Sequence, residues 1–374
     1  NLLGGALRSR LFWIAAVAVV VIHMNNYAVM WWPEKLITIQ VRFDFRALVS
    51  LFPTFARGGG YGIAYPRLLF TVVGFAYFLS TDVSLSMGIA PYVYAWFNGL
   101  CLGYGVRLGA NFLALENIER NLYGGAYLAI GLVMLYNGRR YYTSVFRRSV
   151  FLKDRDDPET TAVWGARVLM LASAAFVIQL IGVGIDWQLA VLYTALALII
   201  FCAVSRTIAE TGAFYIGTEV FPGAIIWGFM GATALGPSTM LIMFLVTVIL
   251  LVGPGWAPMP FMVQSLKLAD DVDVKVSRVA NLAVITLLLS TAIALPMILY
   301  WQYDRGALLA SGGWPRYAAT FPFENMVEIQ HRLTAQGTLE LSESLSGWRR
   351  FLHIAPTGPA VTAFFVALTL SIGI

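Results

Sequence analysis

The chain has 374 residues, of which 59% are hydrophobic and only 12% carry a charge. Soluble domains contain about 25% charged residues, so this composition excludes a soluble enzyme and an intrinsically disordered chain. The net charge of +5 and the mean hydropathy of +0.74 are typical of a polytopic membrane protein, in which positive loops set the orientation, rather than of a nucleic-acid-binding protein.

Apolar stretches long enough to approach a membrane span recur along the whole chain. A spanning helix needs about 20 mostly apolar residues. The stretches that qualify are 11–31, 68–80, 83–105, 123–137, 162–185, 187–205, 239–252, 280–303 and 359 to the end. A further apolar region, 208–237, is interrupted by glycine and proline. We therefore predict an all-α, polytopic transmembrane helical bundle of about 8–10 spans, with one broken or re-entrant segment.

Charged loops predict the orientation of this bundle. The stretch 138–160 holds six cations, the densest basic stretch in the chain, and is predicted to be a cytoplasmic loop. Counting spans back from it makes 33–66 an outer loop. The long loop 304–356 carries apolar residues at helical spacing and is expected to contain an interfacial helix. Since the sequence starts without Met and ends in an apolar run, we expect 1–374 to be a single transmembrane domain from a longer chain.

Three polar residues in or beside the first three apolar stretches are candidates for a site. His23 and Asn25 lie late in the first span, where an unpaired polar group in hydrocarbon costs several kcal/mol. They either lie close enough to the outer membrane interface to be hydrated or line a polar cavity. Asp82 lies at the turn between the second and third stretches. It is either a helix N-cap or a membrane carboxylate that couples to protons.

The strongest indication of a functional site comes from the interrupted region. Arg206 and Glu210 are four residues apart, so they share one helix face and can pair, and Glu219 follows in the broken part. A broken helix at membrane depth is tolerated only where its backbone is buried in protein or lines a water-filled cavity. Transporters aim such half-helices at substrates or ions. The alternative is an ordinary helix end at Arg206, with Glu210 as its surface partner.

Several kinds of chemistry have no motif in this sequence. There is no phosphate-binding Gly-rich loop ending in Lys and Ser/Thr, and no zinc- or serine-protease motif. Only one of the three histidines, His23, lies in a predicted span, so we expect no redox cofactor and no metal site. The acidic run 270–273 is flanked by cations and is interpreted as a solvated loop. No sequence motif supports a membrane enzyme that uses Asp44 or Glu324, so we expect no enzymatic activity.

Three stretches together resemble one known family. Val72 to Ser84, Arg206 to Gly212 and Gln264 to Asp270 are similar to an uncharacterised family of multispanning bacterial membrane proteins, classed as a domain of unknown function. The resemblance covers roughly residues 11–354, and there is a more distant likeness to oligopeptide transporters. It implies the bacterial cytoplasmic (inner) membrane as the location. The family has no assigned catalytic or binding residues, so none is carried over to this chain.

Two functions follow as hypotheses. The first is a secondary-transporter-like carrier of an unidentified small solute. Its substrate- or ion-binding candidates are Arg206, Glu210, Glu219, Asp82, His23 and Asn25. The second is a scaffold or accessory subunit of a larger membrane complex. The expected partners are the lipid bilayer, a small molecule or ion, and other subunits or a second copy of the chain, but not a nucleic acid.

Overall fold

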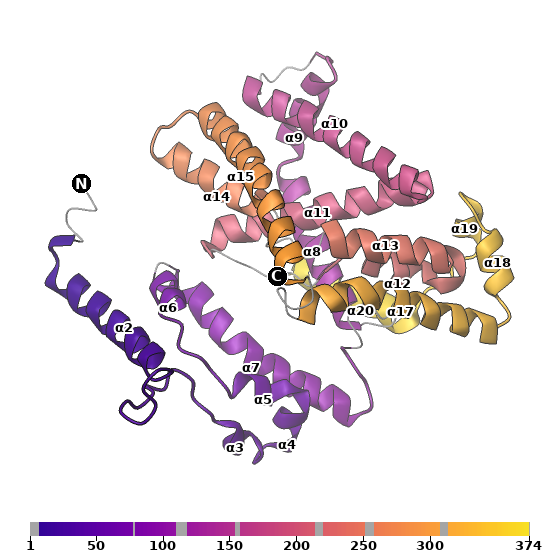
Figure 1. Cartoon of the computed structure of the whole chain (residues 1–374). Coiled ribbons are helices and arrows are strands. Elements are labelled where there is room, and N and C mark those ends of the chain that lie inside the picture. The colour runs from indigo at the N-terminus through magenta and orange to yellow at the C-terminus, as the bar shows by residue number, and fades with distance from the viewer. Residues whose placement is uncertain are drawn as a thin grey trace. The chain divides into compact units, whose positions relative to one another are not determined.

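In the computed structural model the described part of the chain is mostly helical (Figure 1). The structure describes residues 7–77, 79–109, 118–153, 158–213, 220–250, 258–306 and 313–373. These ranges contain no β-strand, and one isolated antiparallel bridge joins Arg42 to Arg67. The chain divides into two compact units, Asn1–Arg107 and Leu108–Ile374, which are described separately.

The first unit is built on one long helix and the short elements packed against it. Its helices are α2 (Arg10–Ala28), α3 (Arg46–Val49), α4 (Pro53–Phe55), the π-helix η1 (Ala56–Gly60), α5 (Tyr61–Ile63), α6 (Phe70–Ala76) and α7 (Thr81–Gly103). A Cβ on Gly58 would overlap the Ala95 carbonyl oxygen, and one on Gly99 would overlap that of Thr54. Glycine at both positions therefore lets the predicted outer loop lie directly on α7.

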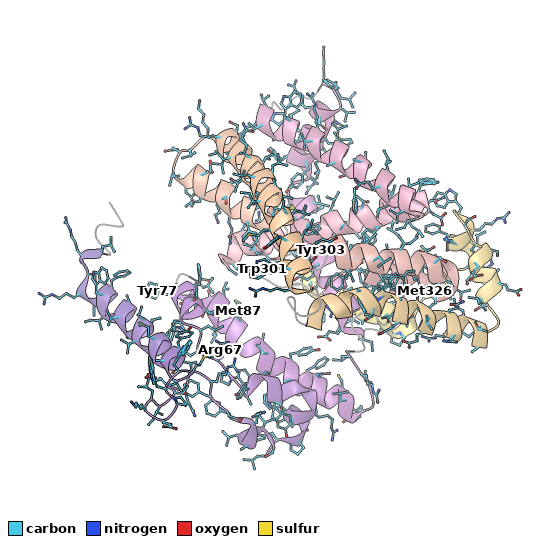
Figure 2. The ribbon with its side chains drawn as sticks, in the orientation of Figure 1. Arg67, Tyr77, Met87, Trp301, Tyr303 and Met326 are labelled. Carbon is cyan, nitrogen blue, oxygen red and sulfur yellow. The ribbon has the colours of Figure 1, made fainter. Side chains whose placement is uncertain are left out.

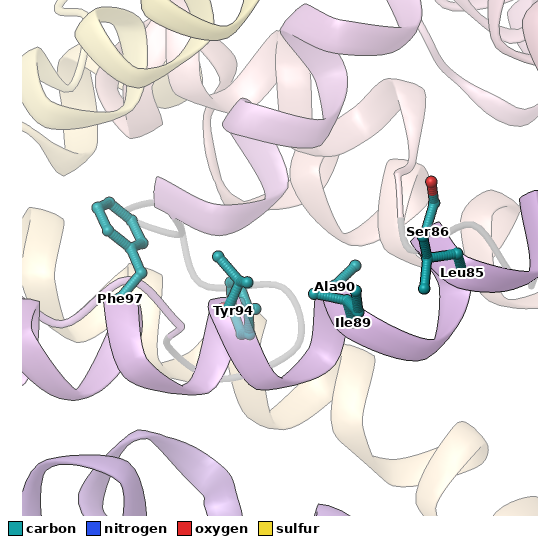
Figure 3. A pocket seen from close by; sticks show the side chains of 7 residues that line it. Leu85, Ser86, Ile89, Ala90, Tyr94 and Phe97 are labelled. Atoms are coloured by element: carbon teal, nitrogen blue, oxygen red, sulfur yellow. The ribbon is translucent and has the colours of Figure 1, made fainter. Parts of the chain in front are cut away.

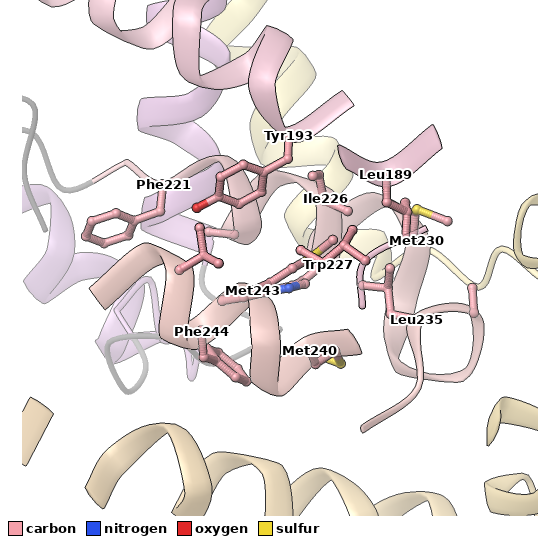
Figure 4. Close-up of a cluster of buried hydrophobic side chains, with 14 of the residues drawn as sticks. Leu189, Tyr193, Phe221, Ile226, Trp227, Met230, Leu235, Met240, Met243 and Phe244 are labelled. Carbon is pink, nitrogen blue, oxygen red and sulfur yellow. The ribbon is translucent and has the colours of Figure 1, made fainter. Parts of the chain in front are cut away.

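The second unit has a hydrophobic core made by helices that follow one another in the chain. Its helices are α8 (Ile118–Asn137), α9 (Arg139–Ser149), α10 (Thr160–Val183), α11 (Trp187–Thr211), α12 (Pro222–Leu235), α13 (Pro237–Leu250), α14 (Pro258–Asp271), α15 (Val276–Arg305), α17 (Gly313–Ala335), α18 (Leu339–Ser344), α19 (Arg349–Leu352) and α20 (Gly358–Gly373). The core lies between α11, α12, α13 and α17 (Figure 4). Its fully buried Trp227 ring packs on Phe244 with centroids 4.2 Å apart.

Small residues bring α8 and α20 into close contact. A Cβ on Gly125 would overlap the Phe364 carbonyl oxygen, and Ala129 and Ala360 are both 0% exposed. Helices in membranes commonly associate through such residues, because a small side chain lets the two backbones approach and gain van der Waals contact. The predicted final span therefore packs back on the helix that opens this unit.

Among the described residues, four helices are long and apolar enough to cross a membrane, which suggests a membrane protein. They are α2, α10, α11 and α15. In α2 and α15 no described residue is buried, and the aromatic residues Trp301 and Tyr303 are exposed near the end of α15 (Figure 2). The helices α12, α13 and α20 are apolar but shorter, and α6 has only 7 residues. A bundle of about 8–10 spans thus remains a prediction.

Candidate functional site

Arg206 and Glu210 line a hollow in the second unit. It has a volume of about 390 Å³ and lies where the C-terminal ends of α8, α11 and α20 approach α9. The residues that line it are Ile130, Val133, Met134, Asn137, Gly138, Tyr142, Arg206, Glu210 and Ser371. It therefore combines an apolar wall from α8 with polar groups from all four helices.

The two charged residues in this hollow form the predicted ion pair. Arg206 Nη2 contacts Glu210 Oε1 within α11, and the side chains are 56% and 58% exposed. Residues at i and i+4 face the same side of a helix, which explains why the spacing in the sequence was sufficient to find this pair. Asn137 and Tyr142 line the same hollow from α8 and α9. The hollow thus offers both hydrogen-bond donors and acceptors to a polar solute.

The end of α11 beside this hollow is held by α14. Lys267 Nζ donates a hydrogen bond to the Ala209 carbonyl oxygen at 3.1 Å, and Gln264 Nε2 donates to that of Ala213 at 2.9 Å. The last carbonyls of a helix have no partner within the helix, so the bond from Lys267 caps α11, while the bond from Gln264 holds the residue that follows the C-cap Gly212. Two of the three stretches that carry the family resemblance, Arg206 to Gly212 and Gln264 to Asp270, therefore contact each other.

In its described part, 208–213 and 220–237, the interrupted region is broken at two of its glycines. Gly231 has φ 79° and ψ 168° within α12, and Gly236 has φ 74° before α13 begins at Pro237. The freed carbonyls are bonded by the segment before α20. The amide of Thr357 donates to the Gly228 oxygen at 3.0 Å, and that of Ala355 donates to the Met230 oxygen at 3.1 Å. Of the two ways to tolerate a break, this one uses burial in protein rather than a water-filled cavity.

A buried arginine closes the other end of the same break. Arg350 donates through Nη1 to the carbonyl oxygens of Ala234, at 3.0 Å, and Leu235. Its Nε donates to Asp186 Oδ2 at 2.5 Å, and the two side chains are 11% and 23% exposed. Asp186 precedes α11 at the turn that follows α10. Neither residue was a predicted site residue, although Asp186 is a lone acid between two apolar stretches, the pattern that drew attention to Asp82.

In the first unit, the polar residues late in α2 hold the loop that follows it. Asn25 Nδ2 donates to the Ile37 carbonyl oxygen at 2.8 Å, while Asn26 donates to the Ile39 oxygen at 2.9 Å and accepts from the Ile39 amide at 2.8 Å. The His23 ring meets Phe70 edge-on at 5.8 Å. These contacts give Asn25 a role in loop packing. Nothing about them requires a cavity.

The remaining predicted site residues are placed as follows. Ser80, rather than Asp82, is the N-cap of α7, and Asp82 lies in the first turn, where a negative charge is stabilised by the helix dipole. Glu219 lies outside the described residues. The Arg46 guanidinium hydrogen-bonds the Asp44 carboxylate and lowers the pKa of Asp44 to about 2. A carboxylate of that pKa is a poor general base near neutral pH.

One face of α7 lines a second hollow (Figure 3). Its residues are Leu85, Ser86, Ile89, Ala90, Val93, Tyr94 and Phe97. Residues at intervals of three or four share one face of a helix, so these side chains form a single face of α7. Ala95 and Gly99, which contact the loop helices, lie on the opposite face. With Ser86 and Tyr94 as its polar members, this face is better suited to apolar contact than to binding a charged solute.

Over the residues that the structure describes, these features define a helical protein with four helices long and apolar enough to span a membrane and a polar hollow at the end of α11. Comparison with family models identifies the family. The chain belongs to DUF6785, a family of unknown function, whose model matches residues 3–347. Comparison with curated proteins and with solved structures finds no match. The predicted membership in a family of unknown function is confirmed.

Proposed function

We propose that this chain is an integral membrane protein that carries a small polar solute, with the Arg206–Glu210 hollow as its binding site. The observation that supports the proposal is a pair of opposite charges lining a hollow of about 390 Å³ at the end of α11, a helix apolar enough to span. Ionisable groups within membrane spans are costly and are commonly functional. The break in α12 is not part of this proposed binding site, because carbonyls at the break are bonded within the protein.

The groups around the hollow favour a solute that carries positive charge or both charges. The C-terminal ends of α8 and α11 lie close to it, and each contributes a partial negative charge. Together with Glu210 they favour an ammonium group. Arg206 would hold a carboxylate through charge-assisted hydrogen bonds. Zwitterionic and cationic solutes are therefore the first to screen.

Uptake into liposomes that contain the full chain tests this function. We expect Glu210→Gln, which keeps the shape of the side chain but removes its charge, to abolish binding or ion coupling of a solute found by screening. Glu343→Gln, at an exposed position of α18, is the matched control and should transport normally. Unchanged affinity and coupling in Glu210→Gln would remove this residue from the mechanism.

A scaffold or accessory subunit is the second candidate. The closure of the break by protein groups favours it, since carbonyls that are bonded by Thr357, Ala355 and Arg350 need no substrate as a partner. The exposed apolar faces of α2 and α15 also suit contact with neighbouring helices as well as with lipid. Purification in mild detergent discriminates between the two. Stoichiometric partner proteins would favour a scaffold, whereas a lone chain or a homodimer would favour transport.

A further inference from the structure

The helix α9 is basic on one face and packed on the other. The sequence from Gly138 to Lys153 contains five cations and no acidic residue. Ser144, Val145 and Ser149 are buried, and α10 holds the end of the helix because Arg167 Nε donates to the Ser149 carbonyl oxygen at 3.1 Å. The opposite face is exposed and carries Arg139, Arg140, Thr143, Phe146 and Arg147.

Two of these cations have no charged partner among the described residues. Arg139 donates to the carbonyl oxygen of Tyr136 at 2.8 Å and stacks over the Tyr136 ring at 4.2 Å, so both of its described contacts are uncharged. Within the described ranges neither Arg139 nor Arg140 forms an ion pair. The described part of this face therefore presents these two cations without acidic partners, which suits an anionic ligand.

Apolar side chains extend the basic face at its C-terminal end. Phe146, Val150, Phe151 and Leu152 are 57%, 47%, 83% and 58% exposed. Val150, Phe151 and Leu152 lie just after the helix, so cations and exposed apolar side chains are neighbours here, as at a membrane surface where cations meet headgroups and apolar groups enter the acyl boundary. A nucleic acid would contact the cations but would leave Val150 and Leu152 without an apolar partner.

Phe151 adds an independent observation. Its φ of 65° is left-handed, a conformation that is unfavourable for a bulky residue and is usually taken by glycine at a helix end. The Arg167 guanidinium stacks over the Phe151 ring at 4.2 Å and over that of Trp164 at 5.0 Å. The chain thus holds a strained phenylalanine with its ring largely exposed, which is explained if the ring has an apolar surface to enter.

We infer that α9 and the turn that follows it bind the headgroups of anionic phospholipids. The arginines would contact the phosphates, while Phe146 and Phe151 would enter the apolar boundary below them. The position of α9 between α8 and the candidate span α10 places it where a membrane surface would lie. The inference rests on membrane insertion of α10 and not on the carriage of a solute, so the two proposals can fail separately.

Lipid retention by the purified full chain in neutral detergent tests this inference. Native mass spectrometry would compare retained phosphatidylglycerol with retained phosphatidylcholine. We expect preferential retention of phosphatidylglycerol, weakened about 30-fold in the Arg139→Gln, Arg140→Gln double variant, because each cation at an anionic surface contributes roughly fivefold. The matched control is Arg42→Gln with Arg67→Gln, two exposed cations of the first unit joined by a backbone bridge, which should retain the lipid normally.

Phe151→Gly separates lipid binding from folding. Glycine tolerates the left-handed backbone, so thermal unfolding should occur at the same or a higher temperature while retention of phosphatidylglycerol falls. Equal retention of both lipids by the wild type, or equal retention of phosphatidylglycerol by the wild type and both variants, would overturn the inference. So would displacement of the lipid by a short RNA that binds more tightly, because that result would assign α9 to a nucleic acid.

Discussion

Arg350 and Asp186 form a part-buried ion pair although 164 positions of sequence separate them. The pair joins the turn before α11 to α19. Through the Ala234 and Leu235 carbonyls, Arg350 also joins α19 to the end of α12. One side chain therefore adds polar bonds between three segments that also pack against one another in the hydrophobic core. We interpret it as the residue that makes the broken α12–α13 region a stable part of the fold.

Removal of Arg350 should destabilise the second unit strongly. Arg350→Met keeps much of the side-chain volume but leaves the Asp186 carboxylate and two carbonyl oxygens without their donor. Breaking one partner of a buried pair costs about 3–5 kcal/mol, and partial exposure of Asp186 places the expected loss near ~3 kcal/mol. Thermal or denaturant unfolding in mild detergent measures it.

A double-mutant cycle shows how much of this loss belongs to the ion pair. Asp186→Asn alone should be less harmful, since Arg350 keeps its two carbonyl acceptors. The double variant should be no more than slightly less stable than Arg350→Met, because the ion pair is already lost. Strictly additive effects would show that the two side chains do not interact in solution.

In the first unit, Asn26 should control access to the loop after α2. Asn26→Ala removes two hydrogen bonds to Ile39, each worth roughly 1 kcal/mol, so the loop should open about 30-fold more often. Trypsin can report this opening by cleavage after Lys35 or Arg42. Asn25→Ala, which loses one bond to Ile37, should increase cleavage less. Unchanged cleavage in Asn26→Ala would mean that other contacts hold the loop.

The sequence was sufficient to predict most long helices, because apolar runs of about 20 residues report burial in lipid or protein directly. The predicted stretch 187–205 appears as α11, and the stretch 280–303 as α15. The sequence was not sufficient to predict the depth at which each helix lies. The predicted interfacial helix in 304–356 appears as α17, yet its Phe321 and Leu333 are buried in the core. Apolar periodicity is the same for a helix that faces lipid and one that faces protein.

The candidate site was predictable only where its residues are close in sequence. Arg206 and Glu210 were found from their spacing of four. Asn137 and Tyr142, which line the same hollow, come from other helices and carry no local pattern. The break at Gly231 was expected, but the partners of its carbonyls lie more than a hundred residues further along the chain at Arg350 and Ala355. Such pairings are set by tertiary packing, so no local pattern reveals them.

Lowering the pH should remove the contribution of the Asp44–Arg46 pair. The pKa of Asp44 is lowered from 3.8 to about 2 by the hydrogen bond from Arg46, so the pair stabilises the fold above the unfolded value and loses its effect as the pH falls through about 2. The difference in unfolding temperature between the wild type and Asp44→Asn should be constant down to about pH 4 and then shrink. Because both side chains are about half exposed, the difference should be small throughout. A difference that grows on acidification would contradict this assignment.

The contact between α8 and α20 should respond to a single methyl group. Gly125→Ala places a Cβ against the Phe364 carbonyl oxygen, and because that atom belongs to the backbone it can move only if α20 moves. Overpacking of this kind costs about 1–3 kcal/mol.

Gly165→Ala in α10 is the matched control, since a Cβ there meets nothing within 4 Å. It should leave stability unchanged or raise it by up to ~1 kcal/mol, because alanine favours helix over glycine. Thermal unfolding of the two variants in the same detergent compares them directly. Equal effects would mean that the two helices are not in backbone contact, and the small residues along α8 would then need another explanation.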